Sequence, residues 1–277
     1  MHLRHWVTAL SVIAVTFAGA GSAVAAKPDK GGGGGGKSST EKVVALGDSY
    51  ASGNGTGSAD LNWSCYRSSR AYPALLDDAR PNTSVDFKAC SGATTSTVRS
   101  SQLSSLSRST AYVTLSVGGN DIGFTDLILN CIGSYDQAQC LSTVDTVSGR
   151  IADELPARLD ATYADITNRA PKADLIVVGY PRPFGDNVSC SQANGIDATE
   201  AAALNGVTEQ LDAAIAARVA AAGATYVSVI DGFTGHDVCA STPYLVGRYA
   251  WDYRDIYHPT RAGHAEGFLP LVMAEMN

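Results

Sequence analysis

The sequence predicts an α/β protein in which a parallel β-sheet is covered by helices on both faces. Short apolar, β-branched runs alternate with longer stretches of helical periodicity. The apolar runs are nearly continuous, as expected of strands buried on both faces of a parallel sheet. This pattern covers residues 42–277, which is long enough for one domain with a sizeable core.

Five apolar segments are expected to form the strands. They are 42–46 (KVVAL), 85–90 (VDFKAC), 111–119 (AYVTLSVGG), 173–181 (ADLIVVGYP) and 225–231 (TYVSVID). In such sheets, ligands bind beyond the carboxyl ends of the strands. Ser49 follows the first segment and residues 118–121 follow the third, so both stretches can face one crevice.

Three stretches are expected to be helical. Residues 147–170 place apolar side chains at steps of three and four, and Pro156 should kink or split that helix. Residues 198–223 are rich in alanine, carry one apolar face and end at Gly223. Residues 261–276 form the last predicted helix.

The N-terminal segment is predicted to lie outside the folded domain. Residues 1–26 combine a basic start, an apolar middle and small residues at the end, which is typical of a secretory signal peptide. A membrane anchor is the alternative, but the apolar run is short and interrupted by small residues. Residues 27–41 contain six consecutive glycines and are predicted to be a flexible linker. We therefore expect a secreted protein with one domain over residues 42–277.

The charge of the chain argues against nucleic acid as a partner. Residues 1–41 carry four basic and two acidic side chains, so residues 42–277 have a net charge of −9 against −7 for the whole chain. A net-negative body without a basic patch repels polyphosphates.

The cysteines indicate disulfide bonds. Six are present, namely Cys65, Cys90, Cys131, Cys140, Cys190 and Cys239. An even number in an exported chain is typical of disulfides, and six cysteines allow fifteen pairings. We expect nearest neighbours to pair, 65–90, 131–140 and 190–239, because each bridge then closes one local loop. No C-x-x-C is present, so a zinc site is not expected and we predict no metal.

A serine and a histidine are candidates for nucleophilic catalysis. Ser49 lies in VVALGDSYASGNGTG, either in an ordinary turn after a strand or presented to a substrate. A serine nucleophile needs a base near neutral pH, usually histidine. His258 lies in DYRDIYHPTRAGH, with Asp255 three residues before it and a proline directly after it. His236 is expected in a disulfide-closed loop, and His264 in a structural or surface position.

Other residues around Ser49 have ordinary explanations. Asp48 is at least as well explained as a turn residue as a catalytic one, and Tyr50 and Asn54 are expected to line or brace the site. The GNGTG stretch does not complete a dinucleotide or phosphate-loop motif. Ala51 stands where the G-x-S-x-G elbow requires glycine, which argues against that motif.

Four short motifs, in this order, resemble those of the SGNH or GDSL hydrolase family. They are GDSYASG with Ser49, CSGATT with Gly92, GGND with Asn120, and DIYHP with Asp255 and His258. Each alone is weak, but together they span the predicted domain. The six cysteines and the YHPT ending look most like the secreted bacterial lipases, phospholipases and esterases of that family.

The resemblance implies a three-layer α/β/α sandwich with a central five-stranded parallel sheet of the flavodoxin-like kind. It also implies ester hydrolysis without a cofactor. Ser49 would be the nucleophile and His258 the general base and acid. The N–H groups of Ser49 and Gly92, with the Asn120 amide, would form the oxyanion hole. We predict that the Asp255 carboxylate orients His258; some relatives use a backbone carbonyl instead, and those of Asp255 and Ile256 are near.

The substrate is expected to be an acyl ester or a lipid. Residues 121–131 offer Ile122 and Phe124 for an apolar acyl pocket, although a buried amphipathic turn explains the stretch equally well. No long apolar lid is visible. We therefore expect a lipase or esterase, phospholipase activity included, that acts as a monomer without stable membrane insertion.

Two alternatives stay open, a carbohydrate deacetylase of the same fold and a non-catalytic secreted binding module. For an enzyme with a histidine base, activity should fall below the ordinary histidine pKa of about 6.5.

Overall fold

The computed structural model describes residues 40–134 and 136–276. The predicted signal peptide and most of the predicted linker lie outside these residues. The first strand begins at Glu41, one residue before the predicted domain start. Within the described residues, no helix has the length and apolar character needed to cross a membrane.

Five strands form one sheet in which every neighbouring pair is parallel. They are β1 (Glu41–Gly47), β2 (Thr83–Phe87), β3 (Thr110–Ser116), β4 (Asp174–Val178) and β5 (Thr225–Val227). Their order, β2-β1-β3-β4-β5, is that of flavodoxin-like folds, in which ligands bind where the order reverses between β1 and β3. The predicted fold class is confirmed.

Most predicted strands are longer than the observed ones at their carboxyl ends. β4 stops at Val178, three residues before the predicted end at residue 181, and β5 stops at Val227 instead of residue 231. Past β4, residues 179–181 are still buried, and past β5 Val229 is buried, but these residues pack in loops. These loops leave the sheet at the edge where the crevice was expected.

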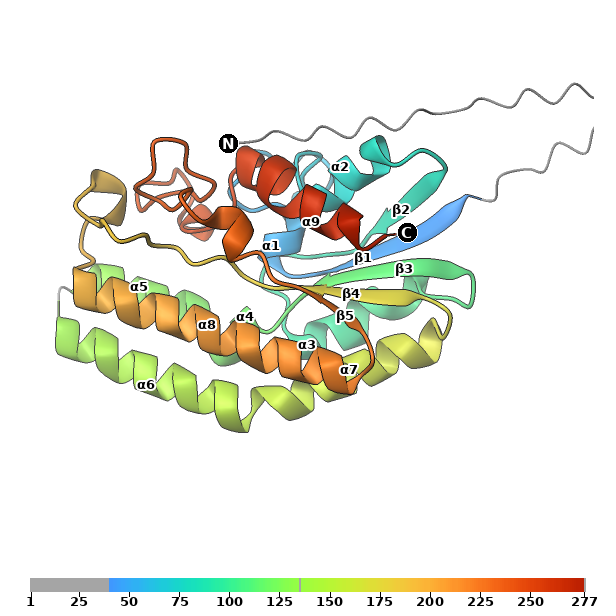
Figure 1. Ribbon diagram of the computed structural model, residues 1–277, viewed down its shortest axis with the longest axis horizontal. Helices are drawn as coiled ribbons and strands as arrows, with labels where there is room; N and C mark the ends of the chain where they lie inside the picture. Colours follow the sequence, from blue (N-terminus) through green and yellow to red (C-terminus); the bar gives the residue numbers. More distant parts are fainter. Residues whose placement is uncertain (1–39, 135, 277) are drawn as a thin grey trace, which may run out of the picture. The chain divides into compact units, whose positions relative to one another are not determined.

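Helices cover both faces of the sheet (Figure 1), with α2 and α9 on one face and α6, α7 and α8 on the other. The helices are α1 (Ser49–Ser52), α2 (Tyr72–Ala79), α3 (Thr95–Thr97), α4 (Gly119–Ile122), α5 (Phe124–Ser134), α6 (Gln137–Asp153), α7 (Leu155–Arg169), α8 (Ala198–Ala221) and α9 (Leu269–Ala274). Shorter 3-10 or π turns are η1 (Val98–Gln102), η2 (Leu103–Ser105), η3 (Ser191–Ala193), η4 (Asp231–Phe233), η5 (Tyr253–Asp255) and η6 (Gly263–Phe268).

Proline positions explain two helix boundaries. Pro156 splits the predicted 147–170 helix, because α6 ends at Asp153 and α7 begins at Leu155 with proline in its first turn. The predicted 261–276 helix is present over residues 261–274, with a π-helical segment at Gly263–Phe268 and α-helix again from Leu269, beside Pro270. Proline has no N–H to donate back along the helix, so a regular helix starts anew there.

The three disulfides pair as predicted, Cys65–Cys90, Cys131–Cys140 and Cys190–Cys239. The bridges close loops with sequence separations of 25, 9 and 49 residues. Constraining such loops in the unfolded chain contributes about 2.5–4 kcal/mol each in the chain-entropy description. The first bridge also ties two loops that border the site described next.

Candidate active site

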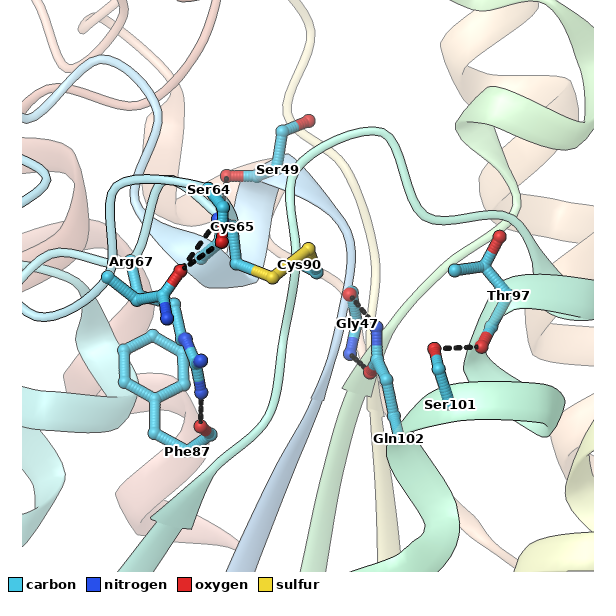
Figure 2. The surroundings of a disulfide bond; sticks show 12 residues. Gly47, Ser49, Ser64, Cys65, Arg67, Phe87, Cys90, Thr97, Ser101 and Gln102 are labelled. Carbon is cyan, nitrogen blue, oxygen red and sulfur yellow. Dashed lines mark hydrogen bonds between the residues drawn. A yellow bond between two sulfur atoms is a disulfide. The ribbon is translucent and has the colours of Figure 1, made fainter.

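Ser49 is the first residue of α1, directly beyond the end of β1. Gly47 exchanges two hydrogen bonds with the Gln102 side chain: its N–H donates to Oε1 and its carbonyl accepts from Nε2, both at 2.8 Å (Figure 2). Gly47 has φ of +137°, and a Cβ there would lie 2.6 Å from the Ser116 carbonyl oxygen. The backbone is thus fixed in a conformation that requires glycine, and Ser49 stands above the strand end.

His258 accepts a hydrogen bond from Ser49. The distance from Nε2 to the Ser49 Oγ is 2.7 Å, and Nδ1 lies 3.1 Å from the Ile256 carbonyl oxygen. A carbonyl can only accept, so Nδ1 carries the proton and Nε2 offers its lone pair to the hydroxyl. This tautomer is the one that a general base for Ser49 requires.

The prediction that the Asp255 carboxylate orients His258 is wrong. Its Oδ1 accepts from the backbone N–H of Gly55 at 2.9 Å, and the Ile256 carbonyl takes the position on the imidazole. The Asp255 carbonyl instead accepts from the His258 N–H at 3.0 Å. Asp255 therefore holds the histidine loop against the turn after α1, and partial burial raises its pKa.

Aromatic packing and burial shape the properties of His258. Its ring centroid lies 4.7 Å from that of Tyr50, whose hydroxyl donates to the Tyr257 carbonyl at 2.9 Å. Asn54 Nδ2 donates to the Arg254 carbonyl at 3.1 Å, so Tyr50 and Asn54 both brace the loop. Desolvation lowers the pKa of His258 to about 4, which moves the expected acid limit of activity down from about 6.5.

Gly92 lies in the loop after β2, and Asn120 lies in α4, which follows β3. Gly92 has φ of +78° and follows Cys90, whose disulfide to Cys65 is drawn in Figure 2. Asn120 Nδ2 donates to the Ala93 carbonyl at 3.1 Å, and an amide nitrogen has a second hydrogen to donate. Both residues line the same cavity as Ser49 and His258.

Tyr180 connects three strand ends beneath the site, and sequence reasoning missed it. Its hydroxyl donates to Asp48 Oδ2 at 2.6 Å and accepts from the Gly119 N–H at 3.3 Å. Asp48 also caps α1 by accepting from the Tyr50 N–H at 3.0 Å, and burial raises its pKa to about 7. Its position in the sequence could have indicated this role, because Tyr180 follows β4 at the same sheet edge as Asp48 and Gly119.

A cavity of about 390 Å³ opens onto Ser49 and His258. Its walls come from the loops after β1, β2, β3 and β4, from α5 and α8, and from the segment before His258. Phe124 lines the cavity as predicted, together with Ile128 and Leu129. Ile122 does not line it: that side chain is 1% exposed and packs in the core, so its predicted substrate contact is wrong.

The sequence left two interpretations of residues 121–131 open, an apolar acyl pocket and a buried amphipathic turn, and both are partly correct. One side of the helical stretch packs into the core through Ile122 and Leu127, and another side faces the cavity. Sequence reasoning missed the walls contributed by Thr208 and Leu211 of α8, whose apolar stripe was assigned to the core alone. Sequence reasoning also missed Tyr66, which lines the same cavity.

The site combines a serine, a neutral imidazole that accepts its hydrogen bond, and hydrogen-bond donors at neighbouring strand ends. On an α/β/α fold, this combination defines a serine ester hydrolase. Residues 45–266 match the GDSL-like Lipase/Acylhydrolase family. The chain belongs to this family, whose members are serine ester hydrolases.

Relatives of known activity or structure support this family assignment. Lipase 1 of Streptomyces coelicolor is 38% identical over 255 residues, covering 92% of this chain and 90% of the relative. The extracellular lipase of Streptomyces rimosus has a TM-score of 0.81 at 37% identity, covering 84% of this chain and 99% of that chain. Phospholipase A1 of Streptomyces albidoflavus has a TM-score of 0.81 at 39% identity, covering 86% and 100%. The extracellular relative and the disulfides identify the chain as a secreted enzyme.

Proposed function

We propose that the protein hydrolyses lipid acyl esters through an acyl-enzyme on Ser49. The observation that carries this proposal is the 2.7 Å contact between Ser49 Oγ and His258 Nε2 at the wall of a cavity of about 390 Å³. Phe124, Ile128 and Leu211 give part of that cavity an apolar surface suited to an acyl chain.

The chemistry follows from the tautomer of His258. Ser49 Oγ attacks the ester carbonyl carbon while its proton passes to His258 Nε2. The imidazolium gives that proton to the leaving alcohol as the carbon–oxygen bond breaks. Water then attacks the acyl-enzyme by the same route, which releases the acid and restores Ser49. The Ile256 carbonyl on Nδ1 holds the ring in place and stabilises the transient positive charge.

Three donors are proposed to stabilise the oxyanion, the N–H groups of Ser49 and Gly92 and the second hydrogen of Asn120 Nδ2. Gly92 suits this role because a Cβ there would meet nothing within 4 Å, so its surroundings stay open to a substrate oxygen. Loss of one such donor typically costs about 10²–10³ in kcat. All these groups belong to one chain, so a single chain holds a complete site, which is compatible with the expected monomer.

The decisive variant is Ser49→Ala. It should keep the wild-type circular dichroism spectrum and lose hydrolysis of p-nitrophenyl acyl esters by at least about 10³-fold. It should also fail to react with a fluorophosphonate probe, which labels only an activated serine. Turnover near the wild-type rate in folded Ser49→Ala would refute the mechanism. If the wild-type protein is folded but the probe does not label it, the result would support the alternative of a non-catalytic binding module.

An acyl-length series from two to sixteen carbons tests the substrate class. The apolar wall predicts that kcat/KM rises beyond acetyl esters, because a longer chain buries more apolar surface. A carbohydrate deacetylase would instead prefer acetyl and lose rate as the chain lengthens.

A further inference from the structure

The large apolar side chains exposed by the described residues all lie on segments that also line the active-site cavity. They are Leu61, Trp63, Leu129, Tyr249, Trp251 and Tyr253, which we call the mouth surface. They lie on three segments, the 58–67 loop, helix α5 and the 247–255 segment. Each of these segments also lines the cavity, through Ser64 and Tyr66, through Leu129, and through Tyr253 and Arg254. Isolated apolar side chains are common on protein surfaces, but a cluster around a site entrance indicates a contact surface.

Two tryptophans are the most exposed side chains of the mouth surface. Trp63 is 72% exposed and Trp251 is fully exposed, at 107% of its reference area. Neither belongs to the cavity lining, so neither is explained by contact with the reacting ester. Tryptophan and tyrosine are the side chains that favour the boundary between water and lipid, where an apolar ring and a polar edge are both satisfied.

The two loops are fastened to one another. The Tyr66 hydroxyl donates to Asp252 Oδ2 at 2.9 Å, and the Arg254 guanidinium lies 4.5 Å from the centre of the Tyr66 ring. The Trp63 and Tyr66 rings are 5.7 Å apart, and Cys65 ties the first loop to Cys90. The aromatic side chains are thus presented on a braced rim, which differs from a lid that opens and closes.

The charges of the two loops cancel. Residues 58–67 contain one acidic and one basic side chain, and residues 247–255 contain two of each. Within the second segment, Asp252 accepts from Arg254 at 2.6 Å. Since neither loop adds positive charge and residues 42–277 are net negative, attraction to anionic lipids is not expected. The chemistry fits an electrically neutral surface.

We propose that the mouth surface docks the enzyme on zwitterionic phospholipid aggregates, with Trp63 and Trp251 inserted among the headgroups. This inference rests on the proposed lipid-ester function and names the physical state of the substrate. Docking in this orientation places the cavity entrance against the lipid, so an acyl chain enters without crossing water. The absence of a predicted lid is compatible with this arrangement, because the rim itself makes the contact.

Tryptophan fluorescence provides a direct test. The chain has three tryptophans, and the predicted removal of residues 1–26 takes Trp6 away, which leaves only Trp63 and Trp251. The secreted form of Ser49→Ala, which cannot degrade the lipid, is titrated with phosphatidylcholine vesicles. We expect a blue shift of the emission and quenching by brominated phosphatidylcholine. Unchanged emission at all lipid concentrations would overturn the proposal.

A matched pair of variants separates docking from chemistry. Trp63→Ser with Trp251→Ser should weaken vesicle binding and hydrolysis of dispersed phosphatidylcholine by about tenfold or more, because two large apolar side chains no longer leave water. Hydrolysis of monomeric p-nitrophenyl butyrate should stay at the wild-type rate. The control, Trp63→Phe with Trp251→Phe, should retain most of the binding. Equal loss on both substrates, or full activity of the serine variant on vesicles, would contradict docking by the tryptophans.

Two further outcomes distinguish other surfaces. Binding that requires phosphatidylglycerol and disappears in 0.5 M salt would show charge-driven adsorption and overturn the proposal. Retention on insoluble xylan without binding to vesicles would assign the aromatic rim to polysaccharide. If folded Ser49→Ala still cleaved the soluble ester, the proposed function would fail independently, since vesicle binding is measured without turnover.

Discussion

The orientation of one imidazole is decided by which oxygen reaches Nδ1. Asp255 and Ile256 both lie within three residues of His258, so the acceptor could be the Asp255 carboxylate or a backbone carbonyl. In the folded chain the Asp255 carboxylate is occupied by the Gly55 N–H, and the Ile256 carbonyl lies 3.1 Å from Nδ1. A carbonyl dipole fixes the tautomer as a carboxylate would, but it brings no full negative charge to the imidazolium.

Asp255→Asn should therefore change catalysis little. The asparagine Oδ1 can still accept from the Gly55 N–H, and the contact between Ile256 and His258 is untouched, so we expect kcat/KM within about threefold of wild type. In a serine protease where a carboxylate holds the histidine, the corresponding change costs about 10⁴ in kcat. Steady-state kinetics on a soluble ester distinguish these values, with His258→Ala as the inactive control. A thousandfold loss in folded Asp255→Asn would contradict the carbonyl assignment.

The pH dependence of hydrolysis reports on the same residue. Burial lowers the pKa of His258 to about 4, and only the neutral ring can accept the Ser49 proton. The base is therefore available above pH 4 and is lost as the pH falls through that value, so the acid limb of kcat/KM should lie near 4 and not near 6.5. A pH–rate profile on a soluble ester measures it. Because burial raises the pKa of Asp48 to about 7, a second inflection could come from that residue, and the pH–rate profile of Asp48→Asn is the control for it.

At the scale of elements, the turn after α1 and the loop carrying His258 must pack backbone against backbone. A Cβ on Gly55 would lie 2.5 Å from the Pro259 carbonyl oxygen and 3.0 Å from the His258 carbonyl carbon. Gly55 also has φ of +85° and donates its N–H to Asp255. The glycine-rich stretch after Ser49 thus lets the histidine loop come close enough to reach the nucleophile.

Gly55→Ala and Gly57→Ala form a matched pair. Both positions have positive φ, so the backbone conformation alone should cost each alanine roughly 1–2 kcal/mol of unfolding free energy, and Gly55→Ala should cost more because its Cβ would clash with backbone. Only Gly55→Ala should also lower kcat/KM, by about tenfold or more, since displacing a catalytic group by about 1 Å can cost about 10²-fold. At Gly57 the nearest atom to a new Cβ is 3.9 Å away. Denaturant unfolding and ester kinetics check both effects, and equal activity in the two variants would rule out this role of close packing.

At the scale of the whole molecule, burial of histidine couples stability to pH. His264 is completely buried, and its Nδ1 accepts from the Tyr72 N–H at 3.2 Å. Desolvation, and to a lesser extent the charge on His258, lower the pKa of His264 to about 3. The unfolded chain takes up this proton near pH 6.5, so between about 3 and 6.5 the unfolded state binds more protons and is favoured as the pH falls.

His264→Asn should flatten this dependence. Asparagine can still accept from the Tyr72 N–H through Oδ1 but does not titrate. We expect the variant to be less stable at pH 7, because a smaller side chain leaves a cavity, and to lose less stability than wild type between pH 6.5 and 4. Urea unfolding at several pH values gives both free energies. Parallel curves for the two proteins would mean that folding does not lower the pKa of His264, which would contradict the prediction.

Local signals predicted much of this molecule. Nearly continuous apolar runs identified the five strands, and Pro156 divided a helix, because both depend on residues close in the chain. Neighbouring cysteines paired because each bridge closes one local loop. Local signals failed for Ile122, which faces the core and not the cavity, since a side chain's direction on a short helix is set by what packs around it.

The amino-acid sequence by itself determined the α/β class, the disulfide framework and the loops that carry Ser49, Gly92, Asn120 and His258. Only the tertiary structure decided that Ile256 and not the Asp255 carboxylate holds the histidine, that Tyr180 joins three strand ends, and that the exposed aromatic side chains border one cavity mouth. The physical reason is distance along the chain. Strands and local loops follow from interactions between near neighbours. The contact between Ile256 and His258 is itself local, but it is decided by the Gly55 N–H, 200 positions from Asp255, which takes the carboxylate. The other contacts join residues far apart in the chain and exist only once the sheet has brought its loops together.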